Sequence, residues 1–249
     1  MRVVLRDAVY VIAISNFTRQ LVIKTEKNAN TIIINPCVET ARFMTDFKIV
    51  ASLKNSHRKI ITVARLVKSK GHDTVLKALP KVIERFPDTK YFIIGEGPEE
   101  NNLKELAREL GLSQYIVFTG QVDEAELILH YRTCDLFILT SREIETNGEV
   151  EGFGIVFLEA GACGKPVIGA RSGGIQDAVI DKMTGILVDP SDISGTSEAI
   201  IKLLSDEELR NRLGKNGKIR VEKELNMTVF AEKLQMVLTN NLHYDEKKD

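Results

Sequence analysis

Residues 135–168 read DLFILTSREIETNGEVEGFGIVFLEAGACGKPVI, and this stretch decides the fold. It begins with a short apolar run at residues 135–139 and ends with another at residues 166–168. Between them lie a polar loop, from Ser141 to Glu151, and a segment that is apolar nearly all round, which is typical of a buried helix. A strand, a helix and a second strand in this order predict two parallel strands joined by a crossover helix.

The same alternation extends through most of the chain. From about residue 60, short apolar runs alternate with longer amphipathic segments, as expected for parallel strands covered by helices on both faces. The sequence therefore predicts an α/β fold, a doubly wound parallel sheet of about six strands. The strands are expected at residues 60–63, 91–94, 115–118, 135–139, 166–168 and 185–188.

Glycine and proline give local signals for where the helices end. Gly111 stands where a left-handed C-cap would end the helix before it. Pro80 is expected to kink or restart the helix in which it lies. After Val188 the chain is expected to be helical to about residue 239, with breaks near Gly214 and Gly217.

These elements predict three parts of unequal size. Residues 58–239 are expected to form one complete α/β domain, and residues 240–249 a charged, solvated tail. Residues 1–57 hold two strand-like runs and a helix expected at residues 16–25. That is too little to fold alone, because a strand pair with one helix buries only a marginal core. This part is therefore expected to be the end of a larger domain.

Composition argues against several classes of protein. The 249 residues include 34 Lys and Arg and 35 Asp and Glu, so the net charge of -1 supplies no positive field for a nucleic acid. The three cysteines lie far apart and form no C-x-x-C pair, which argues against disulfides and a zinc site. No apolar run approaches the roughly 18 residues that span a bilayer, and the start does not resemble a signal peptide, so a cytoplasmic protein is expected.

Four polar or glycine-rich segments follow predicted strands, where ligands of doubly wound sheets bind. The first places Arg65, Lys68 and Lys70 just ahead of a helix. Cations beside a helix N-terminus suit a phosphate group, and a solvated basic turn is the alternative.

Two of these segments carry weaker signals. Gly95-Glu96-Gly97-Pro98 is expected to be a tight turn, because it lacks the third glycine of a dinucleotide-binding fingerprint. Ser172-Gly173-Gly174 fits either a close backbone approach or a simple turn, and the sequence alone does not choose.

The remaining segment is the start of the apolar helix. Glu159 is anomalous there, because a carboxylate on a buried helix is costly unless a partner hydrogen-bonds it. If the helix begins near Phe153, Glu159 lies about 9 Å along it, with Glu151 in the loop ahead. Gly152 and Gly154 would leave the first-turn amides uncovered for an anion. The pattern fits a sugar, a diphosphate and a second sugar in a row, and a glycine turn with a structurally satisfied Glu159 is the alternative.

Together these segments resemble the donor half of the retaining GT-B glycosyltransferases of group 1. The E-x7-E element, from Glu151 to Glu159, is the most recognisable signature of that family. The resemblance covers residues 58–225 and includes Arg65-Leu66, Lys70-Gly71, Gly95-Glu96-Gly97-Pro98, Phe118 to Val122, Gly164 to Ile168, Ser172-Gly173-Gly174 and Thr184-Gly185. It implies a Rossmann-like GT-B C-terminal domain. It also implies an enzyme that moves a sugar from a nucleotide-sugar donor to a lipid or saccharide acceptor, in glycolipid or surface polysaccharide synthesis.

The resemblance implies roles for individual residues. Arg65 and Lys70 would hold the donor diphosphate and stabilise its developing charge without a metal, and Glu151 would face the donor sugar. Further donor contacts are implied for Val122 beside the base, the backbone of Phe153, Gly154 and Ile155, and Glu159 at the ribose. The acceptor would attack from the face that the nucleotide diphosphate leaves, with retention of configuration. No enzymic nucleophile, metal or other cofactor is therefore expected.

The match is incomplete at the N-terminus. Residues 9–43 resemble only the last piece of the family's acceptor-binding domain, and the rest of that domain has no counterpart here. The chain is therefore expected to be shortened and to need a separate chain for full activity. An exposed N-terminal face is expected to self-associate or to bind a partner chain. Contact with the inner face of the membrane stays open, because relatives often use a basic face of the N-terminal domain for it.

Three alternatives to an active transferase remain. A non-catalytic nucleotide-sugar-binding or assembly module fits the missing half, whereas the intact Arg65, Lys70 and E-x7-E pattern opposes it. A relative with other chemistry, such as a nucleotide-sugar epimerase, is disfavoured by the spacing of the group 1 motifs. A dehydrogenase is disfavoured because the dinucleotide fingerprint is missing.

Overall fold

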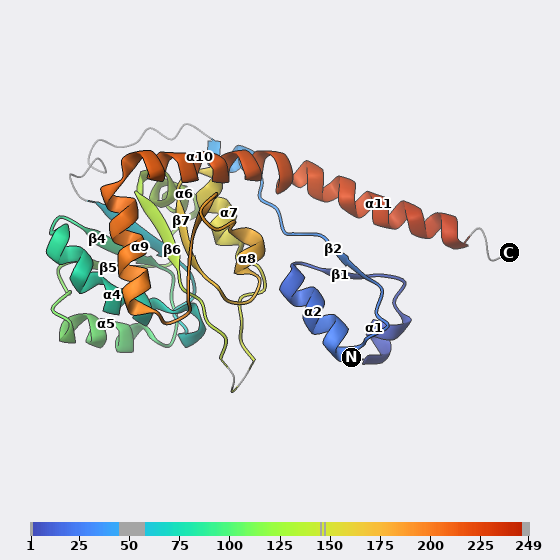
Figure 1. Ribbon diagram of the computed structural model, residues 1–249, viewed down its shortest axis with the longest axis horizontal. Helices are drawn as coiled ribbons and strands as arrows, with labels where there is room; N and C mark the ends of the chain where they lie inside the picture. The colour runs from blue at the N-terminus through green and yellow to red at the C-terminus, as the bar shows by residue number, and fades with distance from the viewer. Residues whose placement is uncertain (1, 45–57, 145, 147, 246–249) are drawn as a thin grey trace.

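The computed structural model describes residues 2–44, 58–144, 146 and 148–245. Within these residues, the larger sheet has six parallel strands in the spatial order β5-β4-β3-β6-β7-β8 (Figure 1). The six predicted strands are confirmed, and their ends differ from the expected ones by at most two residues. The strands are β3 (Lys59–Val63), β4 (Lys90–Ile94), β5 (Ile116–Gly120), β6 (Leu136–Leu139), β7 (Val167–Ala170) and β8 (Gly185–Val188).

Helices cover both faces of this sheet and enclose two hydrophobic cores. One core lies under α6, α7 and α8, and the other under α4, α5 and α9. Neighbouring residues of β6 enter opposite cores, Phe137 the first and Ile138 the second, because side chains alternate along a strand. The doubly wound α/β fold is therefore confirmed. The helices are α4 (His72–Arg85), α5 (Glu100–Glu109), α6 (Glu124–Thr133), α7 (Ile155–Ala162), α8 (Ile175–Ala178), α9 (Ile193–Ser205) and α10 (Glu207–Glu224).

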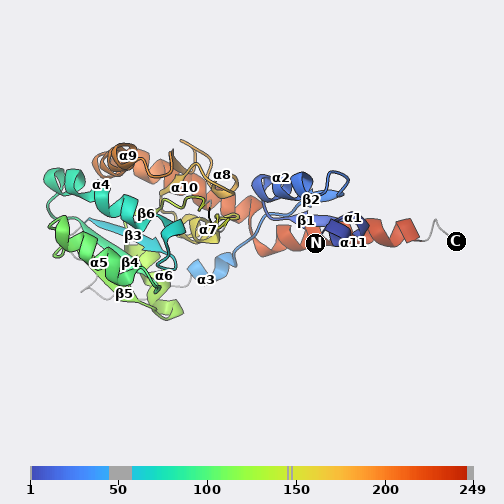
Figure 2. The same ribbon diagram turned by 90° about the horizontal axis from the view of Figure 1, so that it is seen from below.

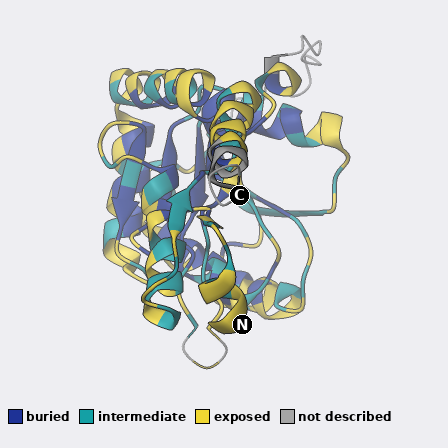
Figure 3. Ribbon diagram, turned by 90° about the vertical axis from the view of Figure 1, so that its right-hand side faces the viewer, coloured by how far each residue is buried: buried dark blue, intermediate teal, exposed yellow. Residues whose placement is uncertain are grey.

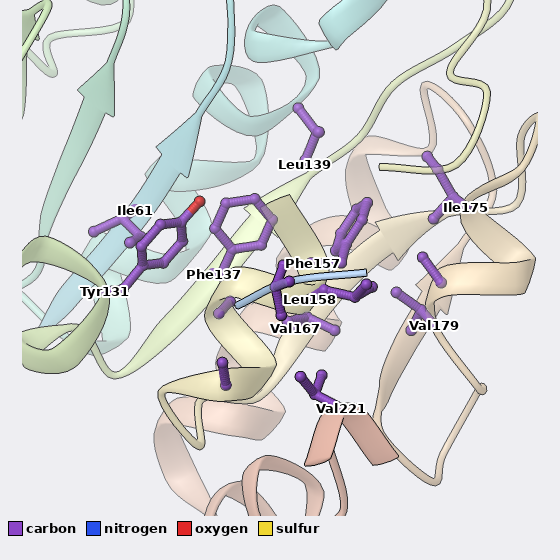
Figure 4. Packing of buried hydrophobic residues seen from close by; sticks show 14 of the residues in the cluster. Ile61, Tyr131, Phe137, Leu139, Phe157, Leu158, Val167, Ile175, Val179 and Val221 are labelled. Carbon is purple, nitrogen blue, oxygen red and sulfur yellow. The ribbon is translucent and has the colours of Figure 1, made fainter. Parts of the chain in front are cut away.

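Three aromatic side chains, Tyr131, Phe137 and Phe157, lie among aliphatic residues in the core beneath α6 and α7 (Figure 4). The ring centroid of Phe137 lies 5.9 Å from that of Tyr131 and 5.3 Å from that of Phe157, the latter pair edge to face. Such pairs add to the stabilisation that burial alone provides. This packing fixes α6 and α7 against the centre of the sheet, and α7 is the helix that the sequence analysis singled out.

Pro80 does not divide its helix, contrary to the expected restart. Helix α4 runs from His72 to Arg85 as one element with Pro80 inside it. Pro80 is exposed, whereas Leu76, Leu79 and Val82 of the same helix are completely buried. Burial of that apolar face offsets the loss of one backbone hydrogen bond at the proline.

Gly214 and Gly217 do not break the C-terminal helices, which is a second correction. Both lie inside α10, and the interruptions fall instead near Asp206 and Leu225. A Cβ atom at Gly214 would lie 2.0 Å from the carbonyl oxygen of Gly164, so this glycine permits close contact between α10 and the turn after α7. Helices can approach this closely only where a side chain is missing.

The last helix, α11 (Met227–Asp245), is longer than expected. Residues 240–249 were predicted to be a tail, but the helix continues to Asp245, and residues 246–249 lie outside the described residues. In Figures 1 and 2, α11 extends away from the large sheet and past the N-terminal elements. Much of its surface is exposed (Figure 3), including the side chains of Met236 and Leu238.

The N-terminal elements form a separate small unit beside the large sheet (Figure 2). Its two strands are parallel, and the predicted helix at residues 16–25 is confirmed. The short helix at residues 2–7 was not foreseen. The predicted domain boundary near residue 57 lies outside the described residues. The elements of this unit are α1 (Arg2–Asp7), β1 (Val11–Ala13), α2 (Asn16–Thr25) and β2 (Thr31–Ile33). The next helix, α3 (Thr40–Met44), packs instead against α7 of the large domain, with Phe43 in the core.

Candidate donor site at the start of helix α7

The loop after β3 is anchored on the end of β6. It forms a short 3-10 turn, η2 (Lys68–Lys70), and then Gly71 in the left-handed conformation, with φ of 70°. The hydroxyl of Thr140 donates a 2.8 Å hydrogen bond to the carbonyl of Gly71. A Cβ at Gly71 would lie 2.1 Å from the carbonyl oxygen of Thr140. Both the backbone angle and this close approach require glycine, so the position of Lys70 is fixed.

Lys70 and Glu151 meet at this end of the sheet in an ion pair that the sequence did not predict. The Nζ atom of Lys70 lies 2.6 Å from Oε2 of Glu151, and the two side chains are 25% and 16% exposed. The pair is therefore partly shielded from solvent yet open to a ligand. Arg65 lies earlier in the same loop with its side chain exposed, and its carbonyl contacts Nε2 of the buried His72 at 3.2 Å.

The double glycine after β7 is packed directly against the Glu151 loop. The amide of Gly174 donates a 2.8 Å hydrogen bond to the carbonyl of Glu151. A Cβ atom at Gly173 would lie 2.2 Å from that same carbonyl oxygen, and one at Gly174 would lie 1.9 Å from the carbonyl oxygen of Gly152. Of the two interpretations left open by the sequence, the structure selects a close backbone approach.

Helix α7 begins two residues later than expected. Gly154 is its N-cap, with φ of 91°, and Ile155 is the first helical residue. The Phe153 side chain is buried in the core, so only its backbone could contact a ligand, whereas the Ile155 side chain is 44% exposed. Among the described residues, the backbone amides of these three residues donate to no protein acceptor. Uncovered amides at a helix start favour an anion.

Glu159 is half-buried, and its hydrogen-bond partner is Tyr131 of α6. The Tyr131 hydroxyl donates a 2.7 Å hydrogen bond to Oε2 of Glu159. Burial raises the pKa of Glu159 above its ordinary value, while the hydrogen bond from Tyr131 opposes that rise. Burial, together with the nearby charge of Glu159, raises the pKa of Tyr131 well above its ordinary value, so the hydroxyl keeps its proton and remains a donor.

Two other predicted segments lie along the same edge of the sheet. Val122 follows β5 and packs, half-buried, against the core under α7. In the Gly95-to-Pro98 loop, a Cβ at Gly97 would lie 2.3 Å from the carbonyl oxygen of Leu66. This loop therefore supports the backbone beside Arg65 in addition to making the expected turn.

Three residues that shape this site were given no role in the prediction from sequence. Tyr131 was not singled out, although it lies three positions after Ile128 on the buried face of α6, a spacing that could have indicated it. Asn16 and Asp177 contact each other across 161 positions of sequence, and no local signal pairs them.

Among the described residues, no group of three or more His, Cys, Asp and Glu side chains is placed to hold a metal ion. Metal-independent chemistry stays a prediction.

A protein-family model described as "Glycosyl transferases group 1" matches residues 44–220, which include every residue predicted to bind the donor. The chain belongs to this family. The family assignment and the predicted resemblance agree, and both rest on the part of the chain that forms the six-stranded sheet and its helices.

Named relatives of this group 1 chain are transferases and a synthase. It is 36% identical to the GDP-mannose-dependent alpha-(1-6)-phosphatidylinositol monomannoside mannosyltransferase of Mycolicibacterium smegmatis, over 74% of this chain and 49% of the relative. It is 31% identical to the N-acetyl-alpha-D-glucosaminyl L-malate synthase of Bacillus anthracis, over 94% of this chain and 58% of the relative. The chain therefore spans about half the length of the curated relatives it matches.

Solved structures confirm the predicted GT-B type of fold. Sucrose-phosphate synthase from Thermosynechococcus elongatus superposes with a TM-score of 0.85 and 26% identity, over 98% of this group 1 chain and 61% of that one. The C-terminal domain of a group 1 glycosyl transferase from Francisella tularensis gives a TM-score of 0.66 and 26% identity, over 76% of this chain and 99% of that one.

Proposed function

We propose that this chain carries the nucleotide-sugar donor site of a glycosyltransferase that acts on a lipid or saccharide acceptor with retention of configuration. One observation supports this most directly. The Lys70–Glu151 pair lies at the start of the helix that carries the half-buried Glu159, beside the amides of residues 153–155, which donate to no acceptor within the described part of the chain. A cation and amides suit a diphosphate, and a carboxylate at each end suits two sugars.

The diphosphate would compete with Glu151 for the ammonium of Lys70. A bound phosphate oxygen near Lys70 weakens the 2.6 Å ion pair, and the Glu151 carboxylate becomes free to accept hydrogen bonds from sugar hydroxyls. Glu159, lower on the same helix, would accept from the ribose. Each group then has a partner in the free and in the loaded site.

Catalysis would rest on stabilising the leaving diphosphate. As the bond between the anomeric carbon and the diphosphate oxygen breaks, negative charge grows on that oxygen, where Arg65, Lys70 and the amides at the start of α7 are expected to lie. The acceptor oxygen forms the new bond from the same face, and its proton passes to the departing diphosphate. No protein nucleophile takes part.

GDP-mannose is the first donor to test, because four relatives that are 35–38% identical over 70–80% of this chain are named as GDP-mannose-dependent mannosyltransferases. Calorimetric titration with GDP, UDP and ADP, and then with their sugar conjugates, tests the site without added metal. One nucleotide should bind, and Glu159→Ala should weaken it roughly 10- to 100-fold. Glu198→Ala, on the exposed surface of α9, is the matched control. No nucleotide binding by the folded wild-type chain overturns the proposal.

An assembly module is the second candidate, and the exposed N-terminal unit favours it. Several large apolar side chains are exposed there: Val3, Val4, Val9, Ile12, Ile14 and Leu21. Such a surface suits a partner chain or a second copy. Light scattering at increasing concentration tests self-association, and a mass that stays monomeric argues against it.

Within the described residues, no helix combines the length and apolar character needed to cross a bilayer.

A further inference from the structure

The chain turns sharply between β1 and α2, and this turn, residues 14–18, is here named the β1–α2 corner. Ser15 is completely buried and caps α2, with its hydroxyl accepting a 3.0 Å hydrogen bond from the amide of Thr18. The Thr18 hydroxyl in turn accepts from the amide of Ser15 at 3.0 Å. This reciprocal capping box makes the corner a rigid element rather than a loose linker.

Asp177 of α8 holds the corner against the large domain through hydrogen bonds to Asn16. Its carboxylate accepts a 2.6 Å hydrogen bond from the side-chain amide of Asn16 and a 3.2 Å hydrogen bond from the backbone amide of the same residue. The short helix α8 is itself fixed from behind, because the guanidinium of Arg220 donates to the carbonyls of Asp177 and Ala178 at 2.6 and 2.5 Å. The backbone that carries the Asp177 carboxylate is therefore held in place by Arg220.

The corner also packs on two glycines that contact or adjoin Glu151. Gly152 follows Glu151 in the chain, and Gly174 belongs to the double glycine after β7. A Cβ atom at Gly152 would lie 3.1 Å from Cδ1 of Ile14, and one at Gly174 would lie 2.8 Å from the hydroxyl oxygen of Ser15. The amide of Gly174 donates to the carbonyl of Glu151 at 2.8 Å. The corner, the double glycine and the Glu151 loop thus form one continuous packed stack.

We propose that Asn16 and Asp177 are positioning residues for Glu151, and that their contact tunes recognition of the donor sugar rather than of the nucleotide. The inference rests on the proposed function. The Asn16–Asp177 contact keeps the corner seated on Gly152 and Gly174, and these glycines hold the backbone of Glu151. Loss of this contact would make the Glu151 carboxylate, which faces the sugar, more mobile. Lys70 would keep its position through the contact of Gly71 with Thr140, and the start of α7 through its packing in the core.

The test compares a nucleotide sugar with its parent nucleotide, GDP-mannose with GDP and UDP-glucose with UDP. Asp177→Ala should weaken nucleotide-sugar binding roughly fivefold or more, within the usual range of coupling between sites, with nucleotide binding nearly unchanged. Asn16→Ala, which keeps its backbone amide, should have a smaller effect of the same kind. The double variant should match Asp177→Ala, because both act through one contact. Asp177→Asn, which keeps an acceptor oxygen, should recover part of the loss.

Hydrogen exchange adds a readout that does not depend on ligand. The amides of residues 16–18 should exchange faster in Asp177→Ala and remain unchanged in Glu198→Ala, an exposed control on α9. An equal loss of nucleotide and nucleotide sugar, or no loss of either, overturns this inference while leaving the donor site in place. Failure of the wild-type chain to bind any nucleotide overturns the proposed function and this inference together.

Discussion

The hydroxyl of Tyr131 donates a 2.7 Å hydrogen bond to the carboxylate of Glu159 and thereby joins α6 to α7 beneath the candidate site. Tyr131 is completely buried, and its ring packs against Phe137. This hydroxyl therefore stabilises a half-buried acid at the edge of an apolar core. Because an unpaired buried acceptor is costly, this contact supports both the fold and the orientation of Glu159.

Removal of that hydroxyl should destabilise the protein measurably. Tyr131→Phe keeps the ring but leaves the Glu159 carboxylate without its donor, so the free energy of unfolding should fall by about 1–3 kcal/mol. The double variant with Glu159→Gln should lose less than the sum of the two single losses, because the residues share one interaction. Urea denaturation measures all four proteins. Strict additivity would contradict a direct coupling.

The raised pKa of Glu159 should make stability depend on pH. Its folded-state pKa lies above the ordinary value of 4.5, so the protonated acid is favoured in the folded protein. This contribution is fully present below the unfolded pKa and is lost as pH rises through the folded pKa. From pH 4 to pH 7, wild type should therefore lose stability relative to Glu159→Gln. Melting temperatures across this range test the trend, and Glu198→Gln controls for removing one negative charge. If the difference in melting temperature between wild type and Glu159→Gln does not change with pH, the prediction is wrong.

The strands and the E-x7-E pattern could be predicted because their signals are local. Apolar runs such as residues 136–139 are continuous, and a carboxylate at Glu159 stands out on an apolar helix. The predicted need for a partner at Glu159 was correct. The identity of that partner was not predictable, because Tyr131 reaches α7 only through the packing of α6 on the sheet.

Errors arose where tertiary packing overrides a local preference. Helix α4 continues through Pro80 because its apolar face is buried. Gly214 is tolerated within α10 because the backbone of Gly164 occupies the space that a side chain would need. The Asn16–Asp177 contact spans two units whose relative position the sequence does not reveal. Glycine and proline report the local backbone, whereas these outcomes depend on neighbours distant in sequence.

Lys70 should matter for nucleotide binding far more than its neighbour Lys68. Both lie on the η2 turn, but the Lys70 ammonium faces Glu151, whereas Lys68 is exposed. Lys70→Ala should weaken binding of the preferred nucleoside diphosphate roughly 10- to 100-fold, since a charge-assisted contact is lost. Lys68→Ala should change it less than about twofold, as expected for an exposed charge. Calorimetry under identical salt tests the pair. Equal effects would indicate a diffuse basic surface instead of a defined phosphate site.

The two glycines of α10 should respond in opposite ways to the same substitution. At Gly214 a Cβ would lie 2.0 Å from the carbonyl oxygen of Gly164, so Gly214→Ala must displace backbone and should cost about 1–3 kcal/mol. At Gly217 the nearest atom, Cα of Gly161, would be 3.5 Å away, an ordinary contact. Alanine there also favours the helix by up to about 1 kcal/mol over glycine, so Gly217→Ala should be neutral or stabilising. The midpoints of urea denaturation of the two variants, compared with wild type, test both expectations. A stable Gly214→Ala protein would show that α10 does not need this close approach.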